Sequence, residues 1–212
     1  MVTTEAPPAA PPRTHPRTAA SAALAWLDAG AWTEAAYFAL PDTNHIVELS
    51  EGRLLVHEMP NLEHQRIVDE LGFAINLLIR EHAGGRKFSS PTPVRLWEGK
   101  IREPDLVYYA AGREDCYHVQ YADPPDLAIE VLSPSTRHID REEKAAEYAD
   151  AGVTEYWIVD PEGRSIEVLT GAGSEGYTSH RQFGPGDEVT STVLPGLVVS
   201  VATLIPAESP LK

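Results

Sequence analysis

Cysteine is almost absent from this chain of 212 residues, which contains only Cys116. A single cysteine excludes an intramolecular disulfide and is compatible with a reducing compartment. The sequence also lacks the cysteine pairs and closely spaced histidines that mark a structural zinc site. We therefore expect a cytoplasmic protein whose fold depends on a hydrophobic core.

Long apolar runs are missing too, and none approaches the roughly 20 residues that span a bilayer. Residues 19–27 follow two arginines and faintly resemble a signal peptide. Their apolar content is mostly alanine, however, and Asp28 ends the run, which favours a short amphipathic helix. We expect no membrane partner.

Basic residues are scarce, because 17 Lys and Arg stand against 32 Asp and Glu, a formal net charge of -15. This balance opposes loose, sequence-independent binding to nucleic acid. The sign is not uniform, since six basic residues fall between positions 80 and 102: Arg80, Arg86, Lys87, Arg95, Lys100 and Arg102. This stretch is compatible with a local cationic face and equally with a solvated hairpin.

The chain nevertheless has the material for a core, with 42% hydrophobic residues and four tryptophans. Its length suits one domain with short appendages. We expect a disordered tail rich in Pro and Ala over residues 1–18, a short helical segment over 19–42, one folded domain over 43–205 and a C-terminal tail over 206–212.

Hydrophobic periodicity predicts a long helix over residues 62–82, with Asn61 as its cap. Asp140 with Glu143 resembles a capping box at the start of a second helix that runs to Gly152. Strand-like runs are found at residues 46–49, 54–57, 88–96, 105–109, 127–132, 155–160 and 165–169, with an edge strand or cover at 192–199. This order predicts an α/β (α+β) fold with a central mixed sheet flanked by helices.

Two carboxylates lie in or beside strand-like runs, where an unpaired charge is costly. Asp105 opens its strand directly after Pro104, which cannot donate a ladder hydrogen bond and so suits a strand start. Glu130 is the lone acid within the apolar run 127–132. A divalent metal is one of the few partners able to offset two such charges. If the two strands are neighbours, Asp105 and Glu130 could bind one ion of Mg²⁺ or Mn²⁺.

A lysine follows on the second predicted helix. Spacings of four, four and three place Asp140, Lys144, Tyr148 and Ala151 on one helical face. Lys144 can then point toward the strand carboxylates, where its ammonium could orient or help deprotonate an attacking water or balance charge on a phosphate. Tyr148 could donate a hydrogen bond to that phosphate or line the pocket. The three groups together suggest metal-assisted phosphodiester cleavage.

Each of these residues also has a purely structural interpretation. Asp105 could be a turn acid, and Glu130 a buried carboxylate paired with an arginine. Lys144 could form a helix-surface pair with Glu147 or Asp140. From the residues alone, the catalytic and the structural interpretations remain open, because structural ion pairs also perturb carboxylates.

The joint pattern resembles a known family. Pro104 and Asp105 are followed by LAIEVLSPSTR at residues 127–137 and by EYWIVDP at 155–161. This arrangement is similar to the Uma-two family of restriction endonucleases, within the PD-(D/E)XK nuclease superfamily. The similarity extends from about residue 46 to about residue 199 and includes MPNLEH at 59–64.

The resemblance implies a restriction-endonuclease-like core over 43–205 and a magnesium-dependent hydrolytic site. Asp105 matches the aspartate of the superfamily's "PD", and Glu130 matches its second acid. The lysine expected two residues later is replaced by Leu132. The resemblance therefore gives its role to Lys144, and a long flexible stem makes such a relocation physically reasonable.

Glu63 and His64 are supporting candidates on the same grounds. They open the first long helix, where the superfamily often adds an acid that touches the metal, and His64 matches a histidine common in the family. The alternative is a carboxylate favoured by the helix macrodipole and a histidine that packs on the sheet. For both residues we favour this alternative.

We thus expect a metal-dependent endonuclease that hydrolyses phosphodiester bonds in nucleic acid, with DNA as the expected substrate. A homodimer is compatible with this function, because a double-strand cut needs two sites. A binding or assembly module that keeps the fold without the chemistry is one alternative, supported by the charge of -15 and by Leu132. A hydrolase of small phosphodiesters is the other, because a negative surface matters less there.

Overall fold

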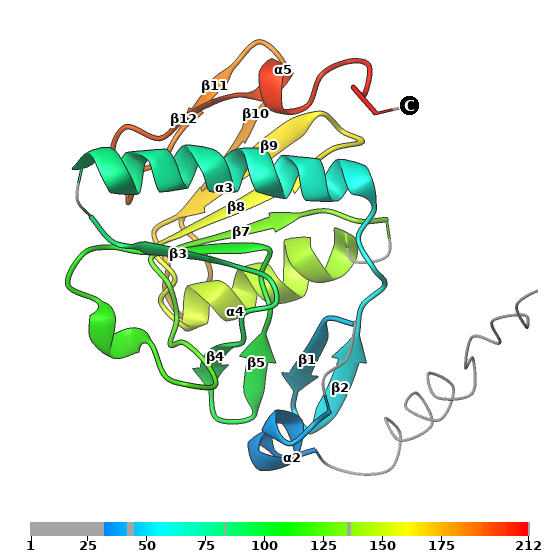
Figure 1. Ribbon diagram of the computed structural model, residues 1–212, viewed down its shortest axis with the longest axis vertical. Helices are drawn as coiled ribbons and strands as arrows, with labels where there is room; N and C mark the ends of the chain where they lie inside the picture. The colour runs from blue at the N-terminus through cyan, green and yellow to red at the C-terminus, as the bar shows by residue number, and fades with distance from the viewer. Residues whose placement is uncertain (1–31, 42–44, 83, 135–136, 212) are drawn as a thin grey trace, which may run out of the picture.

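The structure of the protein is a computed structural model that describes residues 32–41, 45–82, 84–134 and 137–211 (Figure 1). The N-terminal tail and the helix expected at residues 19–27 lie outside the described residues. The described helices are α2 (Glu34–Phe38), α3 (Leu62–His82), α4 (Lys144–Asp150) and α5 (Val201–Leu204), with a 3₁₀ turn at Glu114–Cys116 and a π-helical turn at Ile139–Glu143. The strands are β1 (Val47–Ser50), β2 (Arg53–Val56), β3 (Arg86–Ser89), β4 (Val94–Trp97), β5 (Lys100–Arg102), β6 (Leu106–Tyr109), β7 (Leu127–Val131), β8 (Glu155–Asp160), β9 (Ser165–Thr170), β10 (Ser179–Phe183), β11 (Glu188–Thr190) and β12 (Val198–Ser200).

Two sheets set the layout of the described residues. The main sheet has six strands in the order β10-β9-β8-β7-β6-β3, and the smaller sheet has four in the order β2-β1-β5-β4. Strands β7 and β8 are parallel, whereas the other neighbours in the main sheet are antiparallel. The parallel pair requires a crossover connection, which α4 supplies. The expected mixed sheet flanked by helices is therefore confirmed (Figure 1).

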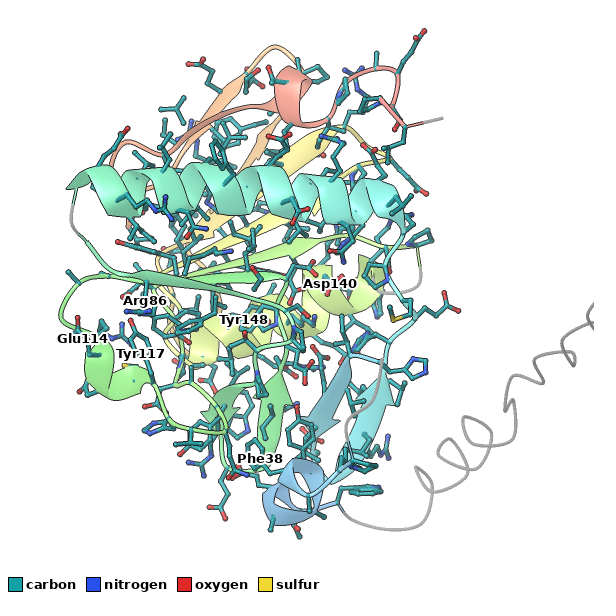
Figure 2. All side chains as sticks on the ribbon, in the orientation of Figure 1. Phe38, Arg86, Glu114, Tyr117, Asp140 and Tyr148 are labelled. Carbon is teal, nitrogen blue, oxygen red and sulfur yellow. The ribbon has the colours of Figure 1, made fainter. Side chains whose placement is uncertain are left out.

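Helices cover both faces of the main sheet (Figures 1 and 2). On one face, Ile67 and Leu71 of α3 pack with Ile129 of β7 in a large apolar cluster. On the other face, Tyr148 of α4 packs with Ala128 of β7 in a second cluster. Successive residues of a strand point to opposite faces, so Glu130 shares the α4 face with Ala128. The Glu130 carboxylate therefore points toward α4.

Gly85 lies against the backbone of Tyr109 at the end of β6, and this close contact leads to a prediction about stability. Gly85 has φ +80°, and a Cβ at this position would lie 2.2 Å from the backbone oxygen of Tyr109. Gly112 has φ +86° with nothing within 4 Å of the same added atom. We expect Gly85→Ala to lower the free energy of unfolding by about 3 kcal/mol and Gly112→Ala by about 1 kcal/mol, because only the first adds a clash to the backbone strain. Urea unfolding of both variants measures the difference, and equal losses would contradict the clash.

Two predicted elements differ from the observed ones. The expected strand at 88–96 is split into β3 of the main sheet and β4 of the smaller sheet. Pro91 and Pro93 lie between them, and a proline has no N–H to donate to a ladder. Asp140 is not a helix cap, because it lies within the π-helical turn and its carboxylate turns toward Lys144 instead. By contrast, the cap at Asn61 is confirmed, since its Oδ1 accepts a hydrogen bond from the His64 amide.

The basic stretch does not form one cationic face. Lys100 and Arg102 lie on β5 and are buried, and both are paired with the Glu147 carboxylate of α4. Arg95 pairs with Glu34 of α2. These charges hold elements together rather than facing solvent as a group.

The C-terminal residues cover the end of α3. Strands β11 and β12 pair with each other, and Ser209 beyond them donates a hydrogen bond to Glu63. Of the expected edge segment at 192–199, only the last part belongs to a strand. None of the helices within the described ranges has the length and apolar character to cross a membrane.

Candidate active site

Asp105 is held at the edge of β6 by the neighbouring strand. Antiparallel pairing sets Leu106 opposite Ile129, so residue 105 lies beside the end of β7. The Val131 amide donates a hydrogen bond of 2.8 Å to Asp105 Oδ2. His64 Nε2 lies 3.1 Å from the same oxygen. Burial lowers the pKa of His64, but the adjacent Asp105 outweighs burial and raises that pKa.

Glu130 lies one residue before Val131 and is 5% exposed. Its Oε1 accepts hydrogen bonds from Lys144 Nζ at 2.8 Å and from the Tyr148 hydroxyl at 2.9 Å. Burial raises the pKa of Glu130 well above its ordinary value, while the Lys144 ammonium acts in the opposite direction. Lys144, which was expected to point toward the strand carboxylates, and Tyr148, which was expected to bind the phosphate or line the pocket, therefore both contact Glu130.

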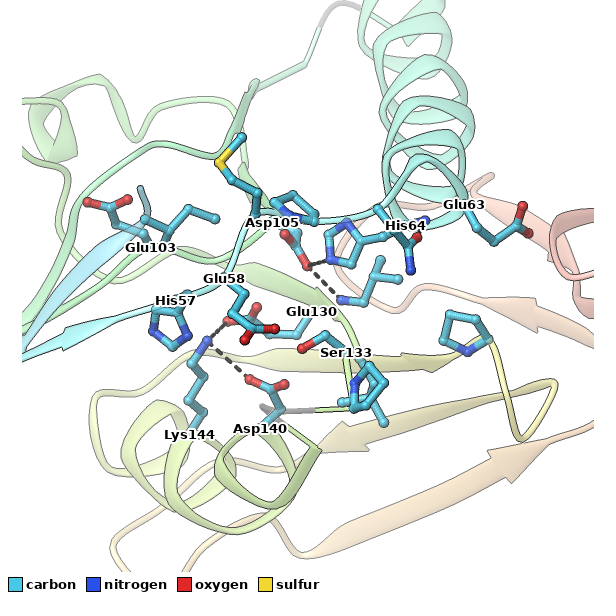
Figure 3. A pocket seen from close by; sticks show the side chains of 18 of the residues that line it. His57, Glu58, Glu63, His64, Glu103, Asp105, Glu130, Ser133, Asp140 and Lys144 are labelled. Carbon is cyan, nitrogen blue, oxygen red and sulfur yellow. Dashed lines mark hydrogen bonds and ion pairs between the residues drawn. The ribbon is translucent and has the colours of Figure 1, made fainter. Parts of the chain in front are cut away.

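The Lys144 ammonium lies among three carboxylates. Besides Glu130, Nζ lies 3.1 Å from Asp140 Oδ1 (Figure 3), and it lies 3.2 Å from Glu48 Oε1. Burial lowers the pKa of Lys144, but the three carboxylates outweigh it and hold the pKa well above the ordinary value. The side chain thus carries its positive charge at neutral pH.

A π-helical turn sets the direction of Asp140 and Lys144. The Lys144 amide donates to the carbonyl of Ile139, five residues earlier. The Asp140 carbonyl accepts a hydrogen bond of 3.0 Å from the buried Tyr156 hydroxyl of β8. A π-turn within a helix is frequent at functional sites. Here it directly precedes α4, and Asp140 of the turn and Lys144 of α4 both line the cavity.

Glu48 of β1 was missed as a site residue. It is fully buried, and its Oε2 accepts a hydrogen bond of 2.8 Å from Arg102 and lies 2.9 Å from His57 Nε2. Burial alone would raise the pKa of Glu48, but Lys144, His57 and Arg102 hold it well below its ordinary range. A lone acid in the apolar run 46–49 is the same signal that singled out Glu130.

Arg102 connects the smaller sheet to α4. Its Nε and Nη2 donate to the two carboxylate oxygens of Glu147 at 2.7 and 2.8 Å, and Lys100 Nζ donates to Glu147 Oε1 at 2.7 Å. Because Arg102 also donates to Glu48, one guanidinium links the helix to the carboxylate that contacts Lys144. This bidentate geometry is the strong form of an Arg–carboxylate pair.

Several of the charged side chains described above line a cavity of about 380 Å³ (Figure 3). Its wall includes Asp105, Glu130, Asp140 and Lys144. Three buried atoms of the wall have no hydrogen-bond partner among the described residues: His64 Nδ1, Glu103 Oε2 and Asp140 Oδ1, of which the last still lies 3.1 Å from the Lys144 ammonium. Buried polar atoms without a partner are rare, so such atoms in a cavity wall suggest a ligand or ordered water.

Of the six candidates, five come together. Asp105, His64, Glu130 and Lys144 line the cavity, whereas the fully buried Tyr148 contacts Glu130 without lining it. Glu63 also lines the cavity, but it points away from this group in Figure 3 and pairs with Arg66 and Ser209, which agrees with its structural interpretation. His64 does more than pack on the sheet, because it contacts Asp105.

A preformed metal cage is absent from the part of the chain that the structure describes. No three His, Cys, Asp or Glu side chains there are grouped so that they could hold an ion by themselves. Magnesium does not need such a cage, because it is commonly bound by one or two carboxylates, waters and substrate phosphates.

Comparison with known proteins places the chain among nuclease-like proteins. Residues 35–202 match the family Uma2, described as "Putative restriction endonuclease". A solved structure, "Crystal structure of a putative nuclease belonging to DUF820 from Anabaena variabilis", is similar with a TM-score of 0.70. The sequences are 20% identical, and the match covers 82% of this chain and 97% of that one, which shows a shared fold. None of the curated proteins matches.

Proposed function

The chain belongs to the Uma2 family of restriction-endonuclease-like proteins, and from this premise we propose that it is a metal-dependent endonuclease. Its substrate is nucleic acid, with DNA expected, and Asp105, Glu130 and Lys144 form the reactive group. The observation that carries the proposal is the 2.8 Å contact of Lys144 with Glu130, beside Asp105, in one cavity.

Asp105 and Glu130 would hold Mg²⁺ or Mn²⁺. Both are oxygen donors, as these hard cations prefer. One oxygen of Glu130 accepts from Lys144 and Tyr148, and one oxygen of Asp105 accepts from Val131, so each carboxylate is oriented by protein donors. A bound cation would activate water and neutralise charge on the phosphate.

Lys144, Tyr148 and His64 would each have a separate role beside the two carboxylates. Lys144 stays protonated and lies next to Glu130, so its ammonium can orient the attacking water or the phosphate oxygen by donating hydrogen bonds. Tyr148 fixes Glu130 from the same helical face. His64 fixes Asp105 from α3. These contacts keep both carboxylates in place before a substrate arrives.

Nuclease assays in Mn²⁺ and Mg²⁺ test this proposal. We expect Asp105→Asn and Glu130→Gln to lower cleavage by about two to four orders of magnitude, because each removes a metal-binding charge. Asp123→Asn is a matched control, since Asp123 is an exposed carboxylate paired with His118. Calorimetric titration with Mn²⁺ separates loss of binding from loss of chemistry.

The assay also separates the alternatives. Metal binding to wild type without cleavage of any nucleic acid would favour a binding module, and the ion cluster around Lys144 would then be structural. Cleavage of a dinucleotide but not of a plasmid would favour a hydrolase of small phosphodiesters. Equal cleavage by wild type and both site variants would refute the assigned residues.

A further inference from the structure

The central groups of the candidate site lie deep in the cavity. The exposed fractions are 7% for Asp105, 5% for Glu130 and 3% for Lys144. A phosphate that reacts there must leave the surface and enter a recess. A flexible single strand can bend a phosphate into such a recess, whereas a closed duplex presents its phosphates on a stiff, wide cylinder.

The cavity also offers little cationic charge. Eight of its lining residues are Asp or Glu, against one lysine and two histidines. The lysine is already shared among three carboxylates. Two nearby arginines, Arg66 and Arg137, are paired with Glu63 and Glu162 of the wall. Duplex binding depends on cationic contacts to several phosphates, and the described wall supplies few of them.

The rim instead offers apolar surface. Met59 is 64% exposed, and Pro60, Pro134 and Pro161 also line the cavity. Flat nucleobases pack on such surfaces when they are unpaired, because every base has an apolar face. Methionine is an adaptable contact of this kind, since its unbranched thioether fits surfaces of different shape.

Two atoms of the wall are available to a polar ligand. His64 Nδ1 and Glu103 Oε2 are buried without partners in the described residues, and both residues line the cavity. A base edge or a sugar hydroxyl carries donors and acceptors that could satisfy them. The cavity thus combines an apolar rim with unpaired polar atoms deeper inside.

We propose that this cavity takes an unpaired nucleic-acid strand, with a nucleotide next to the scissile phosphate packed against Met59 and the rim prolines. This substrate class rests on the function proposed above. Affinity comes mainly from base contacts and the metal-bridged phosphate, so it depends weakly on salt. A duplex is a substrate only where its strands separate.

Binding measurements test the substrate class without requiring cleavage. The probe is a fluorescent strand of about 12 nucleotides, alone or annealed to its complement, in Ca²⁺. We expect the strand to bind the wild type at least about tenfold more tightly than the duplex. We plot the logarithm of the association constant of the strand against the logarithm of the salt concentration. The slope should be shallower than about -2, which corresponds to roughly three neutralised phosphates on a single strand.

Met59→Ala and Leu62→Ala are matched variants. Leu62 is 76% exposed and does not belong to the cavity wall. We expect Met59→Ala to weaken strand binding about three- to tenfold and Leu62→Ala to leave it unchanged. Duplex binding as tight as strand binding would overturn the inference, as would equal binding by both variants and wild type.

Cleavage in Mn²⁺ is measured separately on the same strand. Tight, Met59-dependent binding without cleavage supports this inference and contradicts the hydrolytic function. Cleavage of the duplex at the rate of the strand, with no effect of Met59→Ala, supports the hydrolytic function and overturns the inference. The two proposals therefore fail in different experiments.

Discussion

Replacing Lys144 with methionine is expected to reduce nucleic-acid cleavage by about two to four orders of magnitude. The same change should lower the free energy of unfolding by about 3 to 5 kcal/mol, because it leaves buried carboxylates without their cation. Glu48, Glu130 and Asp140 all lie within 3.2 Å of the ammonium. Cleavage assays in Mn²⁺ measure the first effect, and urea unfolding in a separate, metal-chelating buffer measures the second.

Added Mn²⁺ should then stabilise Lys144→Met more than it stabilises the wild type, since the ion replaces part of the missing positive charge. The change in melting temperature with Mn²⁺ measures this difference. Lys87→Met is the control, because Lys87 is a partly buried lysine that donates to Ser89 rather than to the site. Lys144→Arg keeps the charge with a different shape, so it should recover stability more than activity. Full activity and unchanged stability of Lys144→Met would rule out both roles.

Much of this site follows from local patterns in the sequence. Alternation of side chains along a strand predicts that Glu130 faces away from Ile129 in residues 127–132, and helical spacing predicts that Lys144 and Tyr148 share a face. Both expectations agree with the contacts to Glu130 Oε1. Such periodicities are set by backbone geometry, so they are visible without the tertiary structure.

The partners of buried charges were harder to predict. A lone acid in an apolar strand indicates burial, but not which cation will meet it. Glu48 and Arg102 are far apart in sequence and come together because β1 pairs with β5. The π-helical turn depends in part on Tyr156, a hydroxyl supplied by another strand. These features belong to the tertiary structure, whereas the break between β3 and β4 could have been read from Pro91 and Pro93.

Replacing Arg102 with methionine is expected to lower the free energy of unfolding by about 3 to 5 kcal/mol. Arg102 is fully buried and donates to both Glu48 and Glu147, so its loss leaves two carboxylates without a major partner. Arg113→Met is the matched control, because Arg113 also pairs with a carboxylate, Asp126, but is 36% exposed. We expect the control to cost about 1 kcal/mol or less.

A double-mutant cycle on Arg102 and Glu147 separates the interaction energy of this ion pair from the cost of changing each residue by itself. Changing both Arg102 and Glu147 to methionine should recover part of the loss of Arg102→Met, because the partly buried Glu147 carboxylate, which only Lys100 would still contact, is removed together with its guanidinium partner. Activity should recover less than stability, since Glu48 would still lack the guanidinium that fixes it next to Lys144. Urea unfolding and cleavage assays on the four proteins measure both. If Arg102→Met costs no more than Arg113→Met, the smaller sheet does not hold α4 through this guanidinium, and the position of Lys144 must depend on the other contacts of α4, such as Lys100 with Glu147 and the packing on the main sheet.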